Sequence, residues 1–167
     1  FIAERNAAET LYAAGYSLDN DTVDENLINE AVETAKKCGR ALIFAGMPDS
    51  YESEGYDRRH MRMPASHNAL ISAVCAAVPD SAVVLLAGSP VEMPWLKDAN
   101  ALLHAYLGGQ ALGGAITALV FGDKNPCGRL AETMPVKLED NPSYLNFPGD
   151  GNECNYAEDI YIGYRWY

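Results

Sequence analysis

Strand-like and helix-like patterns alternate along the first 122 residues of the chain. Short continuous apolar runs are typical of strands that are covered on both faces. Longer stretches whose apolar positions recur every three to four residues are typical of amphipathic helices. The pattern predicts strands at 10–16, 41–45, 82–87 and 101–106, and helices at 2–9, 22–38, 64–78 and 110–121.

This alternation predicts the fold class. Strand–helix–strand units build parallel sheets with right-handed crossovers. We therefore expect an α/β sandwich, with a mostly parallel sheet of about five or six strands and helices on both faces. Residues 1–122 are expected to form this core without its first strand, because residues 1–5 resemble the inside of a helix more than the start of a chain.

The composition changes after Gly122. Residues 123–155 are rich in proline, asparagine, glycine and aspartate, which is typical of surface loops. Residues 156–167 hold five aromatic side chains and few polar ones. We therefore expect 123–167 to be a loop-rich extension that packs on the core or on a partner domain.

Three signals mark the ends of the predicted helices. Thr22 to Glu25 has the pattern of a capping box, with the Thr22 hydroxyl at the N-cap and the Glu25 carboxylate at N3. Gly39 is the expected stop of that helix. Pro64 is expected to open the next one.

The net charge indicates which classes of partner to expect, and the spacing of the cysteines indicates the cellular compartment. The chain has 167 residues, with 12 Lys and Arg against 23 Asp and Glu, and a formal net charge of −11. Nucleic acids and anionic membranes favour cationic surfaces, so neither is an expected partner. No apolar run reaches the length of a membrane span. Wide cysteine spacing favours free thiols in a reducing, cytoplasmic compartment over a disulfide framework; the cysteines are Cys38, Cys75, Cys127 and Cys154.

The loop at 50–59 concentrates three acids, two arginines and two tyrosines directly after the predicted strand 41–45. Open α/β sheets bind their ligands at the carboxyl ends of strands. A loop of this kind either carries chemistry or is a solvated turn, and composition alone favours the turn.

Four sequence motifs favour a functional loop over a solvated turn. They are P-D-S-Y-E-S-E-G-Y-D-R at 48–58, G-S-P-V-E-M-P-W at 88–95, F-G-D-K-N-P-C-G-R-L at 121–130 and Y-A-E-D-I-Y-I-G-Y-R-W-Y at 156–167. In this order and spacing they resemble the C-terminal α/β sandwich domain of β-glucosidases in glycoside hydrolase family 3. The resemblance covers the chain from about residue 12 to its end.

The resemblance implies a two-domain active site for retaining hydrolysis of a terminal β-linked glucoside. Retaining glycosidases hold two carboxyl groups about 5–5.5 Å apart, one as nucleophile and one as acid and then base. In the family the aspartate nucleophile lies in a (β/α)₈ barrel domain, which is absent from this chain. The E-G-Y-D-R core assigns the acid/base to Glu54, with Glu52 as the second candidate because loop lengths vary. No metal or organic cofactor is implied, and the isolated chain is expected to be inactive.

Other residues of the loop have open roles. Tyr51 and Tyr56 either line the leaving-group subsite or pin the loop to the domain. Asp57 and Arg58 are adjacent, which favours an ion pair within the loop or to a partner domain over a sugar contact. Gly55 is expected to supply a backbone angle that a larger residue could not adopt.

The three histidines have no ligand spacing among them. His60 lies near enough to the loop to influence its pH dependence. His104 falls in a predicted strand and is expected to be a core histidine with satisfied hydrogen bonds. The glycine-rich stretch 108–114 lacks the P-loop and G-x-G-x-x-G registers, so it is expected to allow close packing rather than to bind a nucleotide.

Three alternatives stay open. The first is a glycosidase of the same family with a different sugar specificity: a β-xylosidase, an α-arabinofuranosidase or a glucosylceramidase. The second is a non-catalytic interaction or sugar-binding module on the same fold. The third is a flavodoxin-like binding domain, which nothing in the glycine-rich turns supports.

Overall fold

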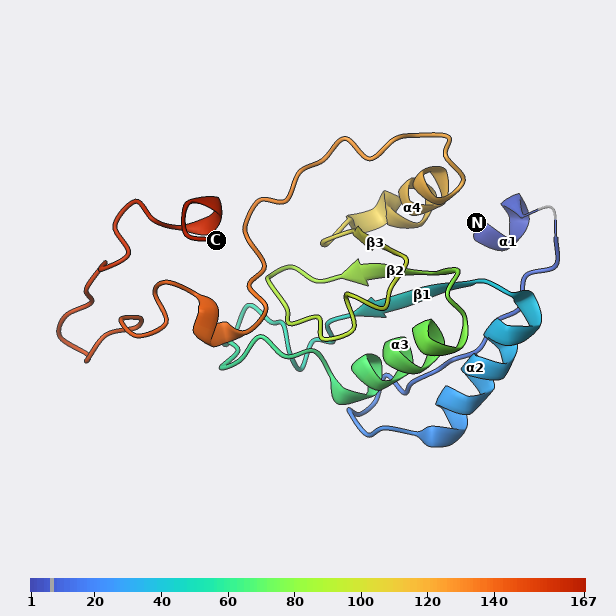
Figure 1. The fold of residues 1–167 in the computed structure, drawn as a ribbon, viewed down its shortest axis with the longest axis horizontal. Coiled ribbons are helices and arrows are strands. Elements are labelled where there is room, and N and C mark those ends of the chain that lie inside the picture. The colour runs from blue at the N-terminus through green and yellow to red at the C-terminus, as the bar shows by residue number, and fades with distance from the viewer. Residues whose placement is uncertain (7) are drawn as a thin grey trace.

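The structure, a computed structural model, describes residues 1–6 and 8–167 (Figure 1). Within these residues the sheet has three parallel strands in the order β1-β2-β3. The strands are β1 (Ala41–Gly46), β2 (Ser81–Leu86) and β3 (Ala101–His104). β2 lies in the centre, where Val83 stands opposite Ile43 on one side and Leu102 on the other.

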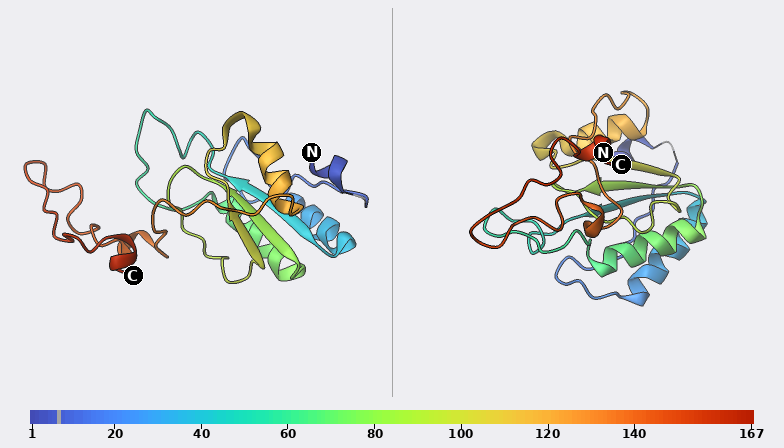
Figure 2. Two further views of the ribbon diagram at one scale, coloured as in Figure 1. Left: turned by 90° about the horizontal axis from the view of Figure 1, so that it is seen from above. Right: turned by 60° about the vertical axis from the view of Figure 1, so that its left-hand side comes forward.

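Helices lie on both sides of the sheet. α2 (Glu25–Cys38) and α3 (Ala65–Ala77) contact each other on one side, and α4 (Leu112–Val120) lies on the other (Figures 1 and 2). The remaining helical elements are one turn long: α1 (Ile2–Arg5), η1 (Gly109–Ala111), η2 (Leu138–Asp140) and η3 (Gly163–Arg165).

The apolar core lies between the sheet and α3. Ile71 on α3 and Val83 and Leu85 on β2 are fully buried. Trp95, in the segment between β2 and β3, is 1% exposed, and its Nε1 donates to Asn68 Oδ1 at 2.9 Å. The carboxyl ends of β1 and β2 lie on this buried core, and the candidate loop begins there.

The sheet is smaller than predicted. The strands expected at 41–45, 82–87 and 101–106 are confirmed, but a sheet of five or six strands is not observed, and 10–16 is not a strand. Gly15 has a φ of 72°, and a Cβ there would lie 2.5 Å from Leu70 Cδ2. Tyr16 stacks on His67 with ring centroids 3.9 Å apart. The segment therefore packs across α3 instead of pairing with the edge of the sheet.

The predicted helices at 22–38, 64–78 and 110–121 are confirmed with shorter bounds. The helix expected at 2–9 is observed only as α1, and its predicted course includes Ala7, which lies outside the described residues. Gly39 ends α2 with a φ of 71°, as expected for a left-handed C-cap.

The predicted capping box at the start of α2 is wrong. The N-cap is Asp24 rather than Thr22, and Asp24 Oδ1 accepts from the backbone N–H groups of Asn26 at 2.9 Å and Leu27 at 3.3 Å. A carboxylate makes this cap and also carries a negative charge that suits the positive end of the helix dipole.

Residues 123–167 contain little regular structure, as the composition predicted. Figure 2 shows much of this segment running away from the sheet. Its large apolar side chains that are more than half exposed are Leu130, Val136, Leu145, Phe147, Tyr156, Ile160, Tyr161, Ile162, Tyr164, Trp166 and Tyr167. Across the described part of the chain, no helix is both long enough and apolar enough to cross a membrane.

Candidate functional site

The charged loop leaves β1 at its carboxyl end and returns to α3, beside the segment that follows β2. Ser53 and Tyr56 form an isolated antiparallel bridge. Glu54 and Gly55 therefore lie at the tip of a tight turn, which we call the acidic turn (residues 53–56).

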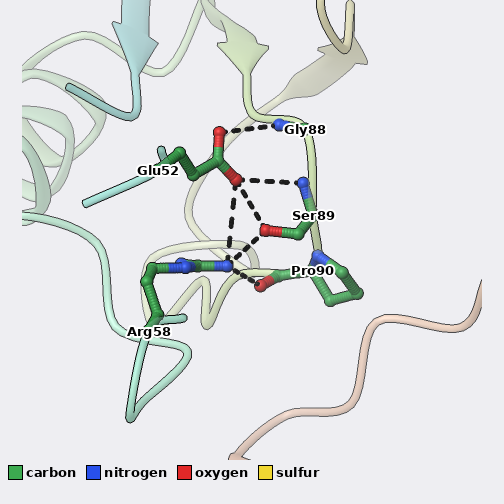
Figure 3. Close-up of polar contacts among 5 residues, drawn as sticks. All are labelled: Glu52, Arg58, Gly88, Ser89 and Pro90. Atoms are coloured by element: carbon green, nitrogen blue, oxygen red, sulfur yellow. Dashed lines mark hydrogen bonds and ion pairs between the residues drawn. The ribbon is translucent and has the colours of Figure 1, made fainter. Parts of the chain in front are cut away.

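Glu52 holds one flank of the acidic turn (Figure 3). Its carboxylate accepts from the backbone N–H groups of Gly88 at 2.9 Å and Ser89 at 3.0 Å. The Ser89 hydroxyl donates to the same carboxylate at 2.6 Å. These three donors attach the loop to the segment that follows β2.

Arg58 holds the other flank on the same segment. Its Nη2 donates to Ser89 Oγ and to the Pro90 carbonyl, the latter at 3.0 Å, and lies 3.8 Å from Glu52 Oε1 (Figure 3). The side chains of Arg58 and Glu52 are only 13% and 18% exposed. Arg58 thus makes the expected ion pair within the loop, with Glu52 as its partner, while Asp57 is exposed.

Glu54 has a different environment from Glu52. It is exposed, and no hydrogen bond or ion pair to its carboxyl group is found within the described residues. Together with Glu52, Arg58, Ser89 and Leu107 it lines a shallow hollow of about 390 Å³. The structure thus brings both candidate carboxylates to one hollow but leaves only that of Glu54 free.

The two tyrosines of the loop are both tied to the protein. Tyr51 donates to Asp21 Oδ2 at 2.6 Å, and this hydrogen bond raises the pKa of the phenol. Tyr56 donates to the Asp49 carbonyl. Both hydroxyls are therefore engaged in pinning the loop, although both side chains also line the hollow.

The structure does not show the backbone angle expected for Gly55, whereas it does place His60 beside the loop. Gly55 has no positive φ, and a Cβ there would meet nothing within 4 Å, so the expected glycine-only backbone angle is not observed. His60 packs edge-on against Tyr51 with ring centroids 5.8 Å apart, which places it under the loop.

Asp21 is a loop-positioning residue that the sequence analysis missed. One carboxylate oxygen accepts from Tyr51, and the other accepts from the backbone N–H of Ala65 at the start of α3. The sequence carries no local signal for this role, because Asp21 and Ala65 are 44 positions apart. Gly88 and Ser89 were noticed only as part of a motif, and their role as donors to Glu52 was missed for the same reason.

A second hollow, of about 320 Å³, shares Tyr51 with the first and is lined by Tyr16, Asp21 and His67 among others. His67 is 5% exposed, and burial lowers its pKa. The lining of this hollow includes neither Glu52 nor Glu54, so it lacks the paired carboxylates of the first one. We therefore place the candidate site at the acidic turn.

His104 does not match its expected role. Both of its ring nitrogens are buried and have no hydrogen-bond partner among the described residues, and burial lowers the pKa of the imidazole. The ring instead stacks on Tyr106 with centroids 3.8 Å apart. It is a packed histidine without satisfied hydrogen bonds.

Metal-ligand geometry is not found in the part of the chain that the structure describes, where no group of three or more His, Cys, Asp or Glu side chains is arranged to hold an ion. Four cysteines are free thiols, and only Cys75 among them is buried.

The chain is similar in sequence to curated beta-glucosidases. The thermostable beta-glucosidase B of Acetivibrio thermocellus is 55% identical over 157 residues, which are 94% of this chain and 21% of that protein. A probable beta-glucosidase I of Emericella nidulans is 46% identical over 143 residues, which are 86% of this chain and 17% of that protein. The chain thus spans about a fifth of the length of the curated relatives it matches.

Two solved structures share the fold. A GH3 beta-glucosidase of Bifidobacterium adolescentis matches with a TM-score of 0.84 and 42% identity, covering 93% of this chain and 23% of that one. A beta-glucosidase of Kluyveromyces marxianus in complex with glucose matches with a TM-score of 0.80 and 44% identity, covering 87% of this chain and 18% of that one. The family model for the glycosyl hydrolase family 3 C-terminal domain matches residues 3–164, and the chain therefore belongs to that family.

Proposed function

We propose that this chain supplies the general acid/base loop of a retaining exo-β-glycosidase, most simply a β-glucosidase, with Glu54 as the acid/base. The rest of the active site lies in a (β/α)₈ barrel domain of the same protein, which carries the aspartate nucleophile. The β-glucosidase names of the relatives support the substrate class, a terminal β-linked glucoside.

The observation that carries the proposal is the contrast between the two glutamates. The neighbours of the Glu52 carboxylate are all donors: two backbone N–H groups, one hydroxyl and one guanidinium. Both carboxylate oxygens of Glu52 are therefore occupied by donors of the protein itself. Glu52 is therefore held by the protein and is not free to approach the leaving oxygen of a substrate. Glu54, exposed at the tip of the same turn, carries no such contacts.

The chemistry needs one carboxyl group that protonates the leaving oxygen and then activates water. A glutamate at the tip of an outward-facing turn can approach a sugar held by a facing domain. The nucleophile of that domain must come within about 5–6 Å of the Glu54 carboxyl for the retaining mechanism.

The extension 123–167 supports the existence of a facing domain. Its exposed apolar side chains, among them Leu145 and Phe147, form more apolar surface than a segment left in water would carry without cost. We infer that this segment packs on the barrel domain rather than on the sheet core.

The test is Glu54→Gln in the full-length protein, assayed on aryl β-glucosides with good and poor leaving groups. General acid catalysis is worth about 10²–10⁴-fold, so kcat/KM should fall by that factor on poor leaving groups. It should fall much less on dinitrophenyl glucosides, whose leaving group needs no proton. Added azide should restore turnover and give the β-glycosyl azide, because azide needs no base to attack the glycosyl-enzyme.

The matched control is Glu30→Gln, which removes an exposed carboxylate from α2, and it should leave all three readouts unchanged. If Glu54→Gln costs less than about threefold on every substrate, Glu54 is not the acid/base, and a non-catalytic module becomes the better account. The same assay on β-xylosides and α-arabinofuranosides decides the sugar.

The isolated chain should show no glucosidase activity, because it holds only one half of the catalytic pair. Turnover by the purified chain that survives in its Glu54→Gln variant would point to a contaminant. Turnover that disappears in the variant would show that this chain contains its own nucleophile.

A further inference from the structure

We propose that Glu52 and Arg58 are positioning residues that together fix where the Glu54 carboxyl lies. They form a clamp, which we define as Glu52 and Arg58 bound to Gly88, Ser89 and Pro90 (Figure 3). The inference rests on the proposed function of Glu54 and adds the means by which the exposed turn is held in place.

The clamp grips the acidic turn at both ends. Glu52 immediately precedes the bridge between Ser53 and Tyr56, and Arg58 follows it by two residues. Both side chains reach the same short segment after β2, across 31 to 37 positions of sequence. A turn that is attached at one end could rotate about that attachment. A turn that is attached at both ends to the same segment, Gly88 to Pro90, cannot.

Ser89 joins the two halves of the clamp. Its hydroxyl accepts from Arg58 Nη2 and donates to Glu52 Oε1, so the hydrogen bonds run in one direction from guanidinium to hydroxyl to carboxylate. The Ser89 backbone N–H adds a second bond to the same carboxylate oxygen at 3.0 Å. The three side chains therefore set one another's orientation.

The clamp lies close enough to Glu54 to control it. One residue separates Glu52 from Glu54, and Glu54 has no contact of its own within the described residues that would hold it. A displacement of about 1 Å in a catalytic group can cost about 10²-fold in rate. The position of an otherwise free acid/base therefore depends on its tethered neighbours.

The experiment is a double-mutant cycle on kcat and KM in the full-length protein, with Glu52→Gln, Glu54→Gln and the double variant. Glutamine keeps the size of Glu52 but loses its charge and half of its acceptor capacity. With Glu54 present, Glu52→Gln should lower kcat on a poor leaving group by about 10–10²-fold while KM changes by less than about threefold. With Glu54→Gln already present, it should cost less than about twofold, because there is no longer an acid to misplace.

Equal losses in both backgrounds would overturn the clamp as a positioning device, since Glu52 would then act independently of Glu54. A loss that appears in KM alone would overturn it as well. These results differ from failure of the proposed function, in which Glu54→Gln itself has no effect.

Ser89→Ala keeps the inference testable if Glu52→Gln does not fold. It leaves both backbone donors and the ion pair in place and removes only the linking hydroxyl. A loss of about threefold to tenfold in kcat is expected, and only when Glu54 is present. Equal loss with and without Glu54 would overturn the inference. Glu30→Gln is the charge control, and circular dichroism melting of each variant verifies the fold.

Discussion

The buried apolar core lies within residues 1–122, which also expose a few large apolar side chains such as Tyr12 and Leu18, whereas the extension 123–167 exposes most of its large apolar side chains. The buried hydrophobic residues of the core run from Ile28 to Ile116, and the central ones are fully excluded from water. In the extension, Leu145 is 89% exposed and Trp166 is 55% exposed. Figure 2 shows the same contrast in shape, with a layered core and a trailing segment.

The contrast shows which part of the sequence encodes a structure by itself. The core closes around one sheet, because its strands and helices cover one another. The extension has exposed apolar side chains without matching internal surface, and this exposure is the basis for the proposed packing on a partner domain. The two tryptophans of the chain provide a probe for each region, since Trp95 lies in the core and Trp166 in the extension.

The largest expected difference comes from removing an apolar side chain in each region. Ile71→Ala should lower the free energy of unfolding by about 3–4 kcal/mol, because it leaves a cavity in a fully buried site. Leu145→Ala should change it by less than about 0.5 kcal/mol in the isolated chain. Urea titration followed by far-UV circular dichroism measures both. A Leu145→Ala effect as large as that of Ile71→Ala would mean that the extension is part of the core.

If the extension packs on a partner domain, its apolar side chains should be buried in the full-length protein, as those of the core are. In a Trp95→Phe background, acrylamide should quench Trp166 strongly in the isolated chain and weakly in the full-length protein. Trp166→Ala should then destabilise the full-length protein by about 2 kcal/mol, as for a buried aromatic anchor at an interface. Equal quenching of Trp166 in both proteins would argue against docking of the extension.

Acid sensitivity should be a property of the core, because all three histidines precede residue 123. Burial lowers the pKa of His67 and of His104 in the folded state. Below about pH 6.5 the unfolded chain binds protons that the folded one does not, so stability should fall as pH decreases through that value. The slope has a limit of about 1.4 kcal/mol per pH unit for each group.

His67→Phe separates this effect from general acid denaturation. The phenyl ring can keep the contact with Tyr16 but cannot be protonated. Urea midpoints at pH 7.5 and 5.5 should therefore lie closer together in the variant than in the parent protein. An unchanged difference between the two midpoints would remove His67 from this explanation.

The smallest expected effect compares two aspartates that accept the same kind of hydrogen bond. Asp24 caps α2, and Asp150 accepts from the backbone N–H groups of Asn152 and Glu153 in the extension. Asp24→Ala should cost about 1 kcal/mol, because it uncaps a helix of the core. Asp150→Ala should leave the urea midpoint of the isolated chain unchanged. A shift of the urea midpoint in Asp150→Ala but not in Asp24→Ala would contradict this prediction.

The sequence predicted those parts of the fold that depend on local patterns. Periodicity located β1, β2 and the long helices, and Gly39 and Pro64 marked their ends as expected. The strand at 10–16 was overpredicted, since its apolar residues suit either a sheet edge or the surface of a helix. The left-handed angle at Gly15 and its contact with Leu70 decide between the two, and neither can be read from alternation alone.

The site was predictable as a loop but not as a geometry. The motif located the two candidate glutamates, yet nothing in residues 50–59 shows which of them binds the next strand's loop. The deciding donors, Gly88 and Ser89, lie 36 and 37 positions from Glu52. The same limit hid Asp21, and it left open which acid of the loop pairs with Arg58, since Glu52 is farther from it in sequence than Asp57.

The two tethers of the acidic turn allow it to vary in the way that an antibody loop varies on its framework. Both anchors lie outside residues 53–56, so the tip can change in sequence while its ends stay attached to the Gly88–Pro90 segment. A library that randomises Ser53 and Gly55 around a retained Glu54 and Tyr56 would therefore search leaving-group specificity on a constant support. Natural diversification of the turn could follow the same route.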